Sequence, residues 1–367
     1  MVYERSRREK MRRFFLFILI SCFLGLFSTA FTDGMETAIF KRVVEPNEKA
    51  FSILVPMGWR TEGGIIRIDP TAQGGPAQSL AAKVDFAIKR DAAGSAMVRW
   101  IPDILYFDPR RSIAGQMGLI PIGSNYSGMP VYYLMSPQDF LTQMIFPRLH
   151  PQASNVQIIE QRELPSLVRK YQQQLSMFQI PVDFSYSAAI VTVTYEEGGV
   201  RYKEKLITVI EDMGQMGGGI WDNKETFFFR APMGEFDQLE PVISVIQSSV
   251  IFNRQWIAQE IMGQIHRGEV MLKTQQYIQE IDRQIVESRQ ETNTEINKDM
   301  FLTLTGQEEF VNPYTNEVET GSSQWTNRWV NENGDVVYSN SNDYDPNQDA
   351  KMGGSFKRST AKAQKAN

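Results

Sequence analysis

Cys22 is the residue whose type and setting point most directly to chemistry. It ends the stretch Leu19-Ile20-Ser21-Cys22, which has the form of a bacterial lipobox, the signal that attaches a lipid to a cysteine. Against lipidation, Phe23 to Phe27 is apolar, whereas mature lipoproteins usually begin with a polar tether. Because the sequence has one cysteine, an internal disulfide and a zinc or iron–sulfur site built from several cysteines are excluded.

Motifs of nucleotide binding and catalysis are missing from the sequence. It has no Gly-Lys-Ser/Thr phosphate loop, no Gly-x-Ser-x-Gly elbow and no His-Glu-x-x-His pair. The two histidines, His150 and His266, have no evident partner along the chain. Asp343 to Asp349 has the alternate spacing of a calcium loop, but Gln348 stands where such a loop needs Gly. We therefore expect no catalytic residue, no cofactor and no metal.

Aromatic residues near the C-terminus are the predicted partner-binding residues. They fall in two short hairpins over residues 305–340, and Asn333-Gly334 marks the second turn. So small a β-meander cannot bury every ring, which predicts an exposed aromatic patch; the alternative is a small core. Residues 341–367 are polar and are expected to be a disordered tail. The predicted binding residues are Phe310, Tyr314, Trp325, Trp329 and Tyr338.

Charge argues against a nucleic-acid partner. Residues 1–30 hold six basic and two acidic residues, so the rest carries 32 basic and 41 acidic residues, a net charge of −9. A chain that acidic lacks the basic surface of a nucleic-acid binder. Hydrophobic residues at 42% and charged residues at 22% are ordinary for a folded protein.

The N-terminus has the layout of an export signal. Two arginines precede an apolar run from Phe14 to Phe27, and the small residues Ser28-Thr29-Ala30 follow. This order is typical of a secretory signal, and the basic flank keeps the N-terminus in the cytoplasm. We expect residues 1–33 to be a cleaved signal peptide or a retained membrane anchor, with lipidation at Cys22 as a third alternative. The remaining chain would then lie in the periplasm or envelope.

Residues 38–250 are expected to form one α+β domain. Lys83 to Lys89 alternates apolar and polar residues, which predicts a strand with one buried face. Asn155 to Arg162 predicts another strand, and Glu196-Glu197-Gly198-Gly199 predicts the turn of a long hairpin. Pro165 opens an amphipathic helix. The expected fold is an antiparallel sheet with flanking helices, followed by a long helix and the small C-terminal β-meander.

Two stretches of this domain resemble a known family. The first is Phe51-Ser-Ile-Leu-Val-Pro-Met-Gly-Trp59, and the second begins at Arg230-Ala-Pro, continues through an apolar helix and ends at Ser248-Ser-Val-Ile-Phe-Asn253. Together they are similar to the PsbP-like fold of exported PsbP/DcrB-like proteins, over about residues 49–256. The resemblance implies an antiparallel sheet with helices on its faces, in a small exported or lipid-anchored protein. It implies no catalytic residues.

Residues 251–300 are expected to belong to one long helix that starts near Ser249. No proline interrupts this stretch, so its interior permits a helix. Three apolar residues recur in it every seven positions, with a fourth between the last two, which is the pattern of a short coiled-coil seam. The seam predicts a weak homodimer; the alternative is a solvated spacer. The seam residues are Met271, Ile278, Ile281 and Ile285.

These features predict an exported bacterial envelope protein that binds or scaffolds a protein partner and is not an enzyme. The membrane contact would be through the N-terminus. The alternative function is a periplasmic hydrolase that uses paired carboxylates in a cleft near Trp100, Asp103 and Asp108. Facing carboxylates in a deep pocket would favour the enzyme, and an exposed aromatic strip would favour partner binding.

Overall fold

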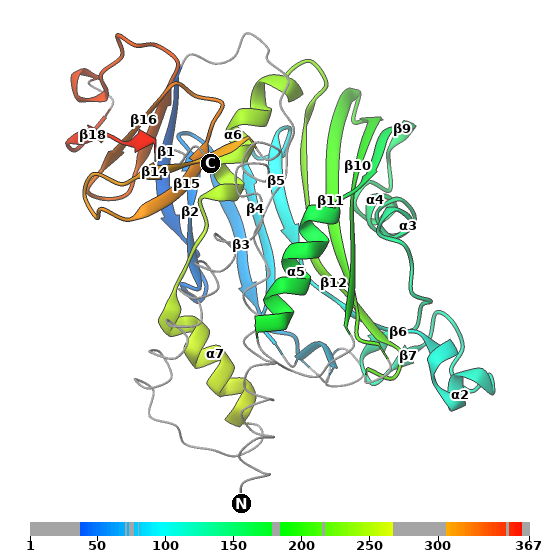
Figure 1. The fold of residues 1–367 in the computed structure, drawn as a ribbon. Helices are drawn as coiled ribbons and strands as arrows, with labels where there is room; N and C mark the ends of the chain where they lie inside the picture. The colour runs from blue at the N-terminus through cyan, green and yellow to red at the C-terminus, as the bar shows by residue number, and fades with distance from the viewer. Residues whose placement is uncertain are drawn as a thin grey trace, which may run out of the picture.

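The fold is built from two large antiparallel sheets with a helix between them (Figure 1). The structure is a computed structural model that describes residues 37–69, 72, 77–79, 81–177, 184–214, 217–266, 306–349 and 352–361. Helix α6 (Phe236–Ser248) lies between the sheets and contacts strands of both. The architecture is mostly β.

The first sheet joins the start of the described chain to its end. Its six strands have the order β13-β2-β1-β17-β16-β18. The central strand β1 pairs with β2 on one side and with β17 on the other; Thr37 lies opposite Ser339, and Phe40 lies opposite Val336. The strands are β1 (Thr37–Val44), β2 (Phe51–Pro56), β13 (Ile251–Phe252), β16 (Asn327–Asn331), β17 (Val336–Ser339) and β18 (Phe356–Arg358).

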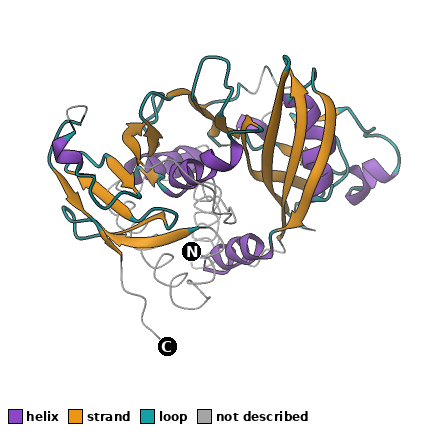
Figure 2. Ribbon diagram, turned by 90° about the horizontal axis from the view of Figure 1, so that it is seen from above, coloured by secondary structure: helices purple, strands orange, loops and turns teal. Residues whose placement is uncertain are grey.

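The second sheet curls into a half-barrel, seen on the right of Figure 2. Its order is β3-β4-β5-β12-β11-β10-β9, and β6 also pairs with β12. Strands β3 and β9 therefore form its two margins. The strands are β3 (Arg60–Ile66), β4 (Lys83–Lys89), β5 (Met97–Ile101), β6 (Leu105–Phe107), β9 (Ser154–Glu163), β10 (Ser185–Glu197), β11 (Val200–Asp212) and β12 (Ile220–Pro232).

Smaller elements complete the described chain. A three-stranded sheet contains β14 (Gln307–Val311), β15 (Val318–Ser322) and β19 (Thr360–Ala361), and a two-stranded sheet contains β7 (Asn125–Tyr126) and β8 (Met129–Pro130). The longer helices are α5 (Pro165–Met177) and α7 (Arg254–His266), together with a continuous stretch of α3 (Pro137–Asp139), the π-helix η3 (Phe140–Ile145) and α4 (Phe146–Leu149). Short turns are η1 (Ala77–Ser79), η2 (Pro109–Arg111), α2 (Ile113–Gln116) and η4 (Pro346–Gln348).

The long hairpin of β10 and β11 follows from its turn. Glu197 pairs with Val200, and the two residues between them, Gly198 and Gly199, have φ of 58° and 78°. Positive φ at both central residues is what a two-residue hairpin turn of type I′ requires, and glycine adopts it without strain. The turn therefore fixes the register of two strands at the centre of the half-barrel.

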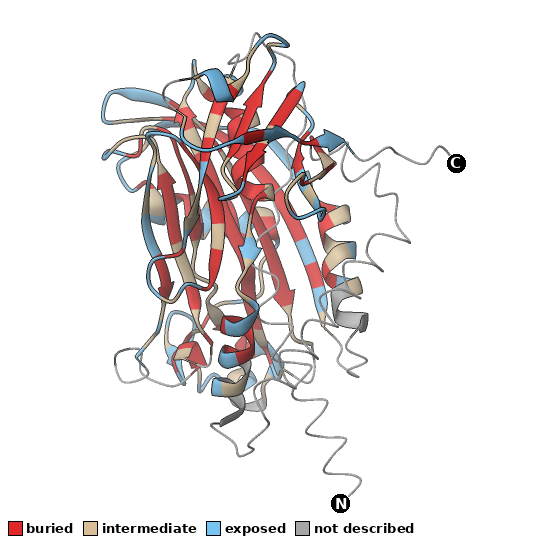
Figure 3. Ribbon diagram, turned by 90° about the vertical axis from the view of Figure 1, so that its left-hand side faces the viewer, coloured by how far each residue is buried: buried red, intermediate tan, exposed pale blue. Residues whose placement is uncertain are grey.

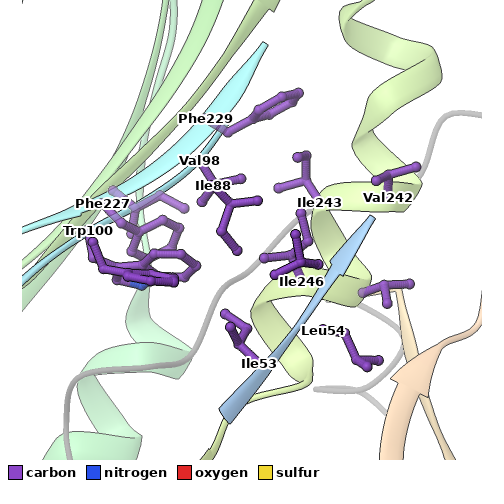
Figure 4. Packing of buried hydrophobic residues seen from close by; sticks show 14 of the residues in the cluster. Ile53, Leu54, Ile88, Val98, Trp100, Phe227, Phe229, Val242, Ile243 and Ile246 are labelled. Atoms are coloured by element: carbon purple, nitrogen blue, oxygen red, sulfur yellow. The ribbon is translucent and has the colours of Figure 1, made fainter. Parts of the chain in front are cut away.

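The main core fills the space between the two sheets. Ile243 and Ile246 of α6 point toward Phe229 and Val98 of the half-barrel, with Ile53 of β2 on the other side (Figure 4). The same core includes four side chains from the C-terminal segment, all buried: Trp325, Val330, Val336 and Tyr338.

A second core lies on the opposite face of the half-barrel, beneath η3. Phe140 packs edge-on against Trp221, which stacks on Tyr106 with ring centroids 4.4 Å apart. Along β10, Ile190 faces the main core and Val191 faces the second core. Strands buried on both faces read as nearly continuous apolar runs. Figure 3 shows the resulting band of buried residues in red along the strands.

The fold class predicted from the sequence is wrong. The structure is mostly β, with two large sheets around α6, and is not one helix-flanked sheet followed by a long helix and a separate meander. The physical reason is the unpaired edge of β1, which β17 completes with backbone hydrogen bonds. Packing reinforces this pairing, since Phe40 and Tyr338 meet edge-on with ring centroids 5.9 Å apart.

The long helix expected from Ser249 does not begin there. Ile251 pairs with Ser52 of β2, so the chain forms strand β13 between α6 and α7. Asn253 then caps α7, because its Oδ1 accepts hydrogen bonds from two backbone N–H groups of the first helical turn. Residues 267–305, including the predicted coiled-coil seam, lie outside the described residues.

The tail predicted to be disordered is partly ordered. Asp345 caps the short helix η4, its Oδ1 accepting the Asn347 N–H at 3.0 Å. Further on, β18 pairs with β16, and β19 pairs with β14. In the described part of the chain, no helix has the length and apolar character needed to cross a membrane. Residues 1–33 and Cys22 lie outside that part.

Candidate functional site

β9 is an edge strand that is exposed along its whole length. All ten of its residues are exposed, and among the described strands it pairs with β10 alone. It stands at the right-hand margin of the half-barrel in Figure 1. An edge strand carries backbone N–H and C=O groups that can pair with another chain. We therefore treat β9 as the candidate binding site.

The register of β9 shows which backbone groups are available. The Leu164 N–H donates to the Ala188 carbonyl at 2.9 Å, which makes this an antiparallel hydrogen-bonded pair. Alternate residues of the ladder repeat the arrangement, so Arg162 also faces β10. The backbone N–H and C=O of Gln161 and Glu163 therefore point away from the sheet.

The two halves of β9 differ in chemistry. The first half exposes Val156 by 45%, Ile158 by 49% and Ile159 by 52%. The second half is charged, and Arg162 Nε lies 3.4 Å from Glu160 Oε1. The pairing with β10 shifts at Ile159, which is a β-bulge. Bulges and charges on an edge strand suppress unselective pairing. We therefore expect β9 to pair only with a strand of complementary side chains.

A second apolar surface lies on the segment between η2 and α3. Its base is fixed by the buried Asp108, which accepts hydrogen bonds from Arg110 and from the Leu134 N–H at 2.9 Å. The Arg110 guanidinium also lies 4.3 Å from the centroid of the Tyr133 ring. The exposed apolar side chains of this segment are Met117, Leu119, Ile122, Tyr126 and Tyr133.

The predicted aromatic binding residues are mostly not at the surface. Phe310, Trp325 and Tyr338 are buried, so they contribute to packing and not to an exposed patch. Trp329 is half-buried on β16, and Tyr314 is half-buried with its hydroxyl donating to the Ser355 carbonyl at 2.6 Å. Trp325 and Tyr338 are covered because the C-terminal strands pack on α6 and β1, a contact that the local sequence does not reveal.

A group of charged and phenolic side chains, most of them buried, lies inside the half-barrel, and we call it the interior charge cluster. Its members come from β4, the loop after β5, α5 and strands β10 to β12, and each interacts with at least one other member. The cluster consists of Lys83, Asp103, Lys170, Tyr171, Tyr186, Glu211, Asp222, Lys224 and Glu225.

Ion pairs and hydroxyl donors hold the cluster together. Lys224 Nζ lies 3.2 Å from Glu211 Oε1, and the Tyr186 hydroxyl donates to Glu211 Oε2 at 2.5 Å. Lys83 Nζ donates to Asp103 Oδ2 at 2.8 Å. Neighbouring carboxylates outweigh the opposing effect of burial and raise the pKa of Lys224, so its ammonium stays charged. These contacts connect β10, β11 and β12 with one another, and β4 with the loop after β5.

Asp222 is the least satisfied member of the cluster. It lies opposite Glu211, at a bulge where Asn223 and Lys224 face Ile210 alone. Asp222 is buried, and its Oδ1 has no hydrogen-bond partner. Burial, reinforced by the Glu211 charge, raises the pKa of Asp222 well above its usual range. The charged form of Asp222 is therefore disfavoured at this position.

On α5, the cluster contains Lys170, a lysine whose pKa is lowered. Burial lowers the pKa of Lys170 to about 7, and the Glu225 charge opposes that change. The Tyr171 hydroxyl donates to Glu225 Oε2 at 2.7 Å. Perturbed groups of this kind occur in catalytic sites and in structural ion-pair networks alike.

Asp103 and Asp108, the two carboxylates proposed for a hydrolase, pair with different basic residues. Asp103 belongs to the interior charge cluster through Lys83, whereas Asp108 caps η2 and pairs with Arg110. They are therefore held by different partners.

His150 anchors a different buried polar group on the face covered by α4. Its Nε2 lies 3.0 Å from Glu204 Oε2, and its Nδ1 lies 3.2 Å from Glu197 Oε2. The Tyr195 hydroxyl donates to Glu204 at 2.7 Å, and Arg230 Nη1 donates to Glu197 at 2.9 Å. Burial opposes a charge on the imidazole, but Glu204 and Glu197 outweigh it and raise the pKa of His150.

Replacing His150 with Gln is expected to destabilise the protein more at pH 6 than at pH 9. A histidine with a raised folded pKa stabilises fully below its unfolded pKa of about 6.5, and this contribution is lost as pH rises through the folded pKa. The stabilisation by the charged imidazole is therefore present at pH 6 and reduced or lost at pH 9, so the two unfolding free energies of the variant and the unchanged protein should differ more at pH 6. Urea unfolding at both pH values measures the difference.

The control for this pH effect is Glu197→Gln, which keeps an acceptor for Arg230 but removes a charge beside the imidazole. It should reduce the pH dependence of stability without removing it. An equal loss of stability at pH 6 and pH 9 in His150→Gln would contradict a charged imidazole.

No family model matches this chain, and no curated protein matches it. The resemblance to PsbP-like proteins over residues 49–256 therefore stays a prediction from short motifs.

The sequence contains signals for β9 and for the interior charge cluster that the sequence-based predictions did not use. In β12, five consecutive polar residues from Asp222 to Thr226 interrupt a strand that continues as Phe227-Phe228-Phe229. Such an interruption indicates a buried polar cluster or a bulge. In β9, the adjacent residues Ile158 and Ile159 break the alternation, which indicates a bulge.

Proposed function

We propose that this chain is an exported envelope protein that binds a protein partner by adding an extended strand of that partner to β9. The single observation that carries the proposal is the exposure of all ten residues of β9 on the open margin of the half-barrel. Export is the prediction made from the basic start and apolar run of the first 33 residues. The binding is non-enzymatic.

In strand addition, backbone hydrogen bonds supply affinity and side-chain contacts supply selectivity. The outward N–H and C=O groups of Gln161 and Glu163 supply main-chain hydrogen bonds, which give affinity. Ile158 and Ile159 offer apolar contacts to alternate side chains of the added strand, and Glu160 and Arg162 favour opposite charges opposite them. The partner segment is therefore extended, partly aliphatic and charged.

Changing Gln161 to Pro is expected to weaken partner capture about tenfold or more. Proline removes the outward N–H and places a ring on the docking edge, and a loss of about 1.4 kcal/mol is tenfold in affinity. The β9–β10 ladder keeps its bonds because Gln161 does not donate to β10. Quantitative affinity capture from the envelope fraction, with the full-length protein as bait, measures the effect.

The matched control is Gln161→Ala, which shortens the same side chain but keeps the N–H. It should capture the partner as the unchanged protein does. Equal capture by the proline variant and the alanine variant would remove β9 as the docking edge, provided that both melt at the temperature of the unchanged protein.

A further inference from the structure

We infer that the strand added to β9 is β9 of a second copy of this chain, paired antiparallel about a two-fold axis at Gln161. The inference rests on the proposed function, since it names the partner of the same edge. The two copies would extend their half-barrel sheets across the shared margin.

Two-fold symmetry restricts how β9 can pair with itself. A symmetric interface places one residue on the axis, opposite its own copy, and every other contact occurs twice. Gln161 suits the axis because its N–H and C=O point away from β10. The two copies of Gln161 would exchange both backbone hydrogen bonds, which is the closed pair of an antiparallel ladder.

The charges of β9 select this axis over its neighbours. With Gln161 on the axis, Glu160 of each copy lies opposite Arg162 of the other, so two attractive pairs form. Glu160 and Arg162 lie on one face of the strand, since they already contact each other at 3.4 Å within one copy. With either charged residue on the axis, like charges would lie directly opposite, which is unfavourable.

The bulge limits the length of the pairing. The ladder about Gln161 runs from Ile159 to Glu163 in each copy, because the register shift lies at Ile159 and α5 begins at Pro165. An interface of this size is small, and we expect a weak, concentration-dependent dimer. It is independent of the predicted coiled-coil seam in residues 251–300.

The first test is a cysteine placed on the axis of the full chain. In an antiparallel hydrogen-bonded pair the Cα atoms lie about 5.5 Å apart, within the range that a disulfide spans. Gln161→Cys should give a covalent dimer when expressing cells are treated with a mild oxidant. Ser154→Cys, equally on β9 but far from the axis, and the unchanged chain with Cys22 alone set the background. We expect at least about tenfold more dimer from Gln161→Cys than from either.

The second test reverses charges in the Gln161→Cys background. Glu160→Arg alone and Arg162→Glu alone each turn both attractive pairs into repulsive ones and should reduce the dimer about tenfold or more. The double variant carrying both reversals should restore it. The two single variants, co-expressed with tags of different size, should form a mixed dimer, because the basic edge of one faces the acidic edge of the other.

The outcomes separate this inference from the proposed function. Dimer at background level, or single variants that fail to combine with each other, overturns self-pairing. If Gln161→Pro still abolishes capture of another envelope protein in that case, the docking edge stands and its partner is a different chain. If Gln161→Pro also changes nothing, both proposals fall. Dimer formation restored by the double reversal and by the mixed pair supports the inference.

Discussion

A chain that ends at residue 305 is expected to lose its cooperative unfolding transition. The missing segment carries β17, the neighbour of β1 on one side, so its removal leaves the central strand of the six-stranded sheet unpaired along one edge. It also uncovers the main core beside Phe40 and α6. We therefore expect that residues 38–250, predicted from the sequence to form one domain, need the C-terminal strands in order to fold.

The free energy of burial lost with the C-terminal segment is large enough to abolish cooperative unfolding. Burying one large apolar side chain is worth about 1.5 to 3 kcal/mol, whereas a whole domain is stable by about 5 to 15 kcal/mol. Four such side chains leave with the segment, so the loss is comparable with the total stability. They are Trp325, Val330, Val336 and Tyr338.

Calorimetry of the shortened chain against a chain ending at Ala361 measures this effect. The longer control keeps every described strand. Tyr338→Ala in the full chain should lower stability by about 3 kcal/mol or more, and the half-buried Tyr314→Ala should have a smaller effect. A shortened chain that melts sharply at the control temperature would falsify the shared core.

Replacing Lys224 with Met is expected to destabilise the protein by about 3 to 5 kcal/mol. The methionine fills a similar volume but leaves Glu211 without the ammonium that lies 3.2 Å from it. Glu211 and Asp222 then face each other in a site that is almost free of solvent. A buried carboxylate that loses its partner retains the cost of its desolvation.

Lys89→Met is the matched control for the buried pair. Lys89 also lies in the half-barrel and pairs with a glutamate, but its partner Glu62 is 48% exposed. Surface pairs of this kind contribute about 0 to 1 kcal/mol. Chemical denaturation of both variants gives the comparison. Similar losses in the two would show that the interior charge cluster is hydrated and not a buried network.

Local sequence predicted the elements whose conformation depends on near neighbours. Gly198 and Gly199 specify a tight turn wherever they lie, so the β10–β11 hairpin was predictable. Pro165 and the apolar stripe behind it predicted α5, and the run from Asn155 predicted β9. The strand was predictable, but its position at the margin of a sheet was not.

The candidate sites depended on contacts that the sequence could not assign. A tryptophan in a short hairpin can be a binding platform or a core residue, and Trp325 became core because α6 and β1 cover it. Asp222 and Glu211 are ten or more positions apart and meet only through the bulged pairing of β11 and β12. The exposure of β9 likewise depends on its place at the end of the strand order, where it pairs with β10 alone among the described strands.

By itself, the sequence determined composition, charge, the layout of an export signal and the local choice between turn, helix and strand. Tertiary structure decided that β1 pairs with β17 and that the C-terminal strands join the main core. It also decided that Ile251 forms a strand with β2 and does not continue a helix. The physical reason is that backbone propensity is set by neighbours in the chain. Strand pairing and side-chain burial are set by whichever distant segment best satisfies an open edge and an apolar face.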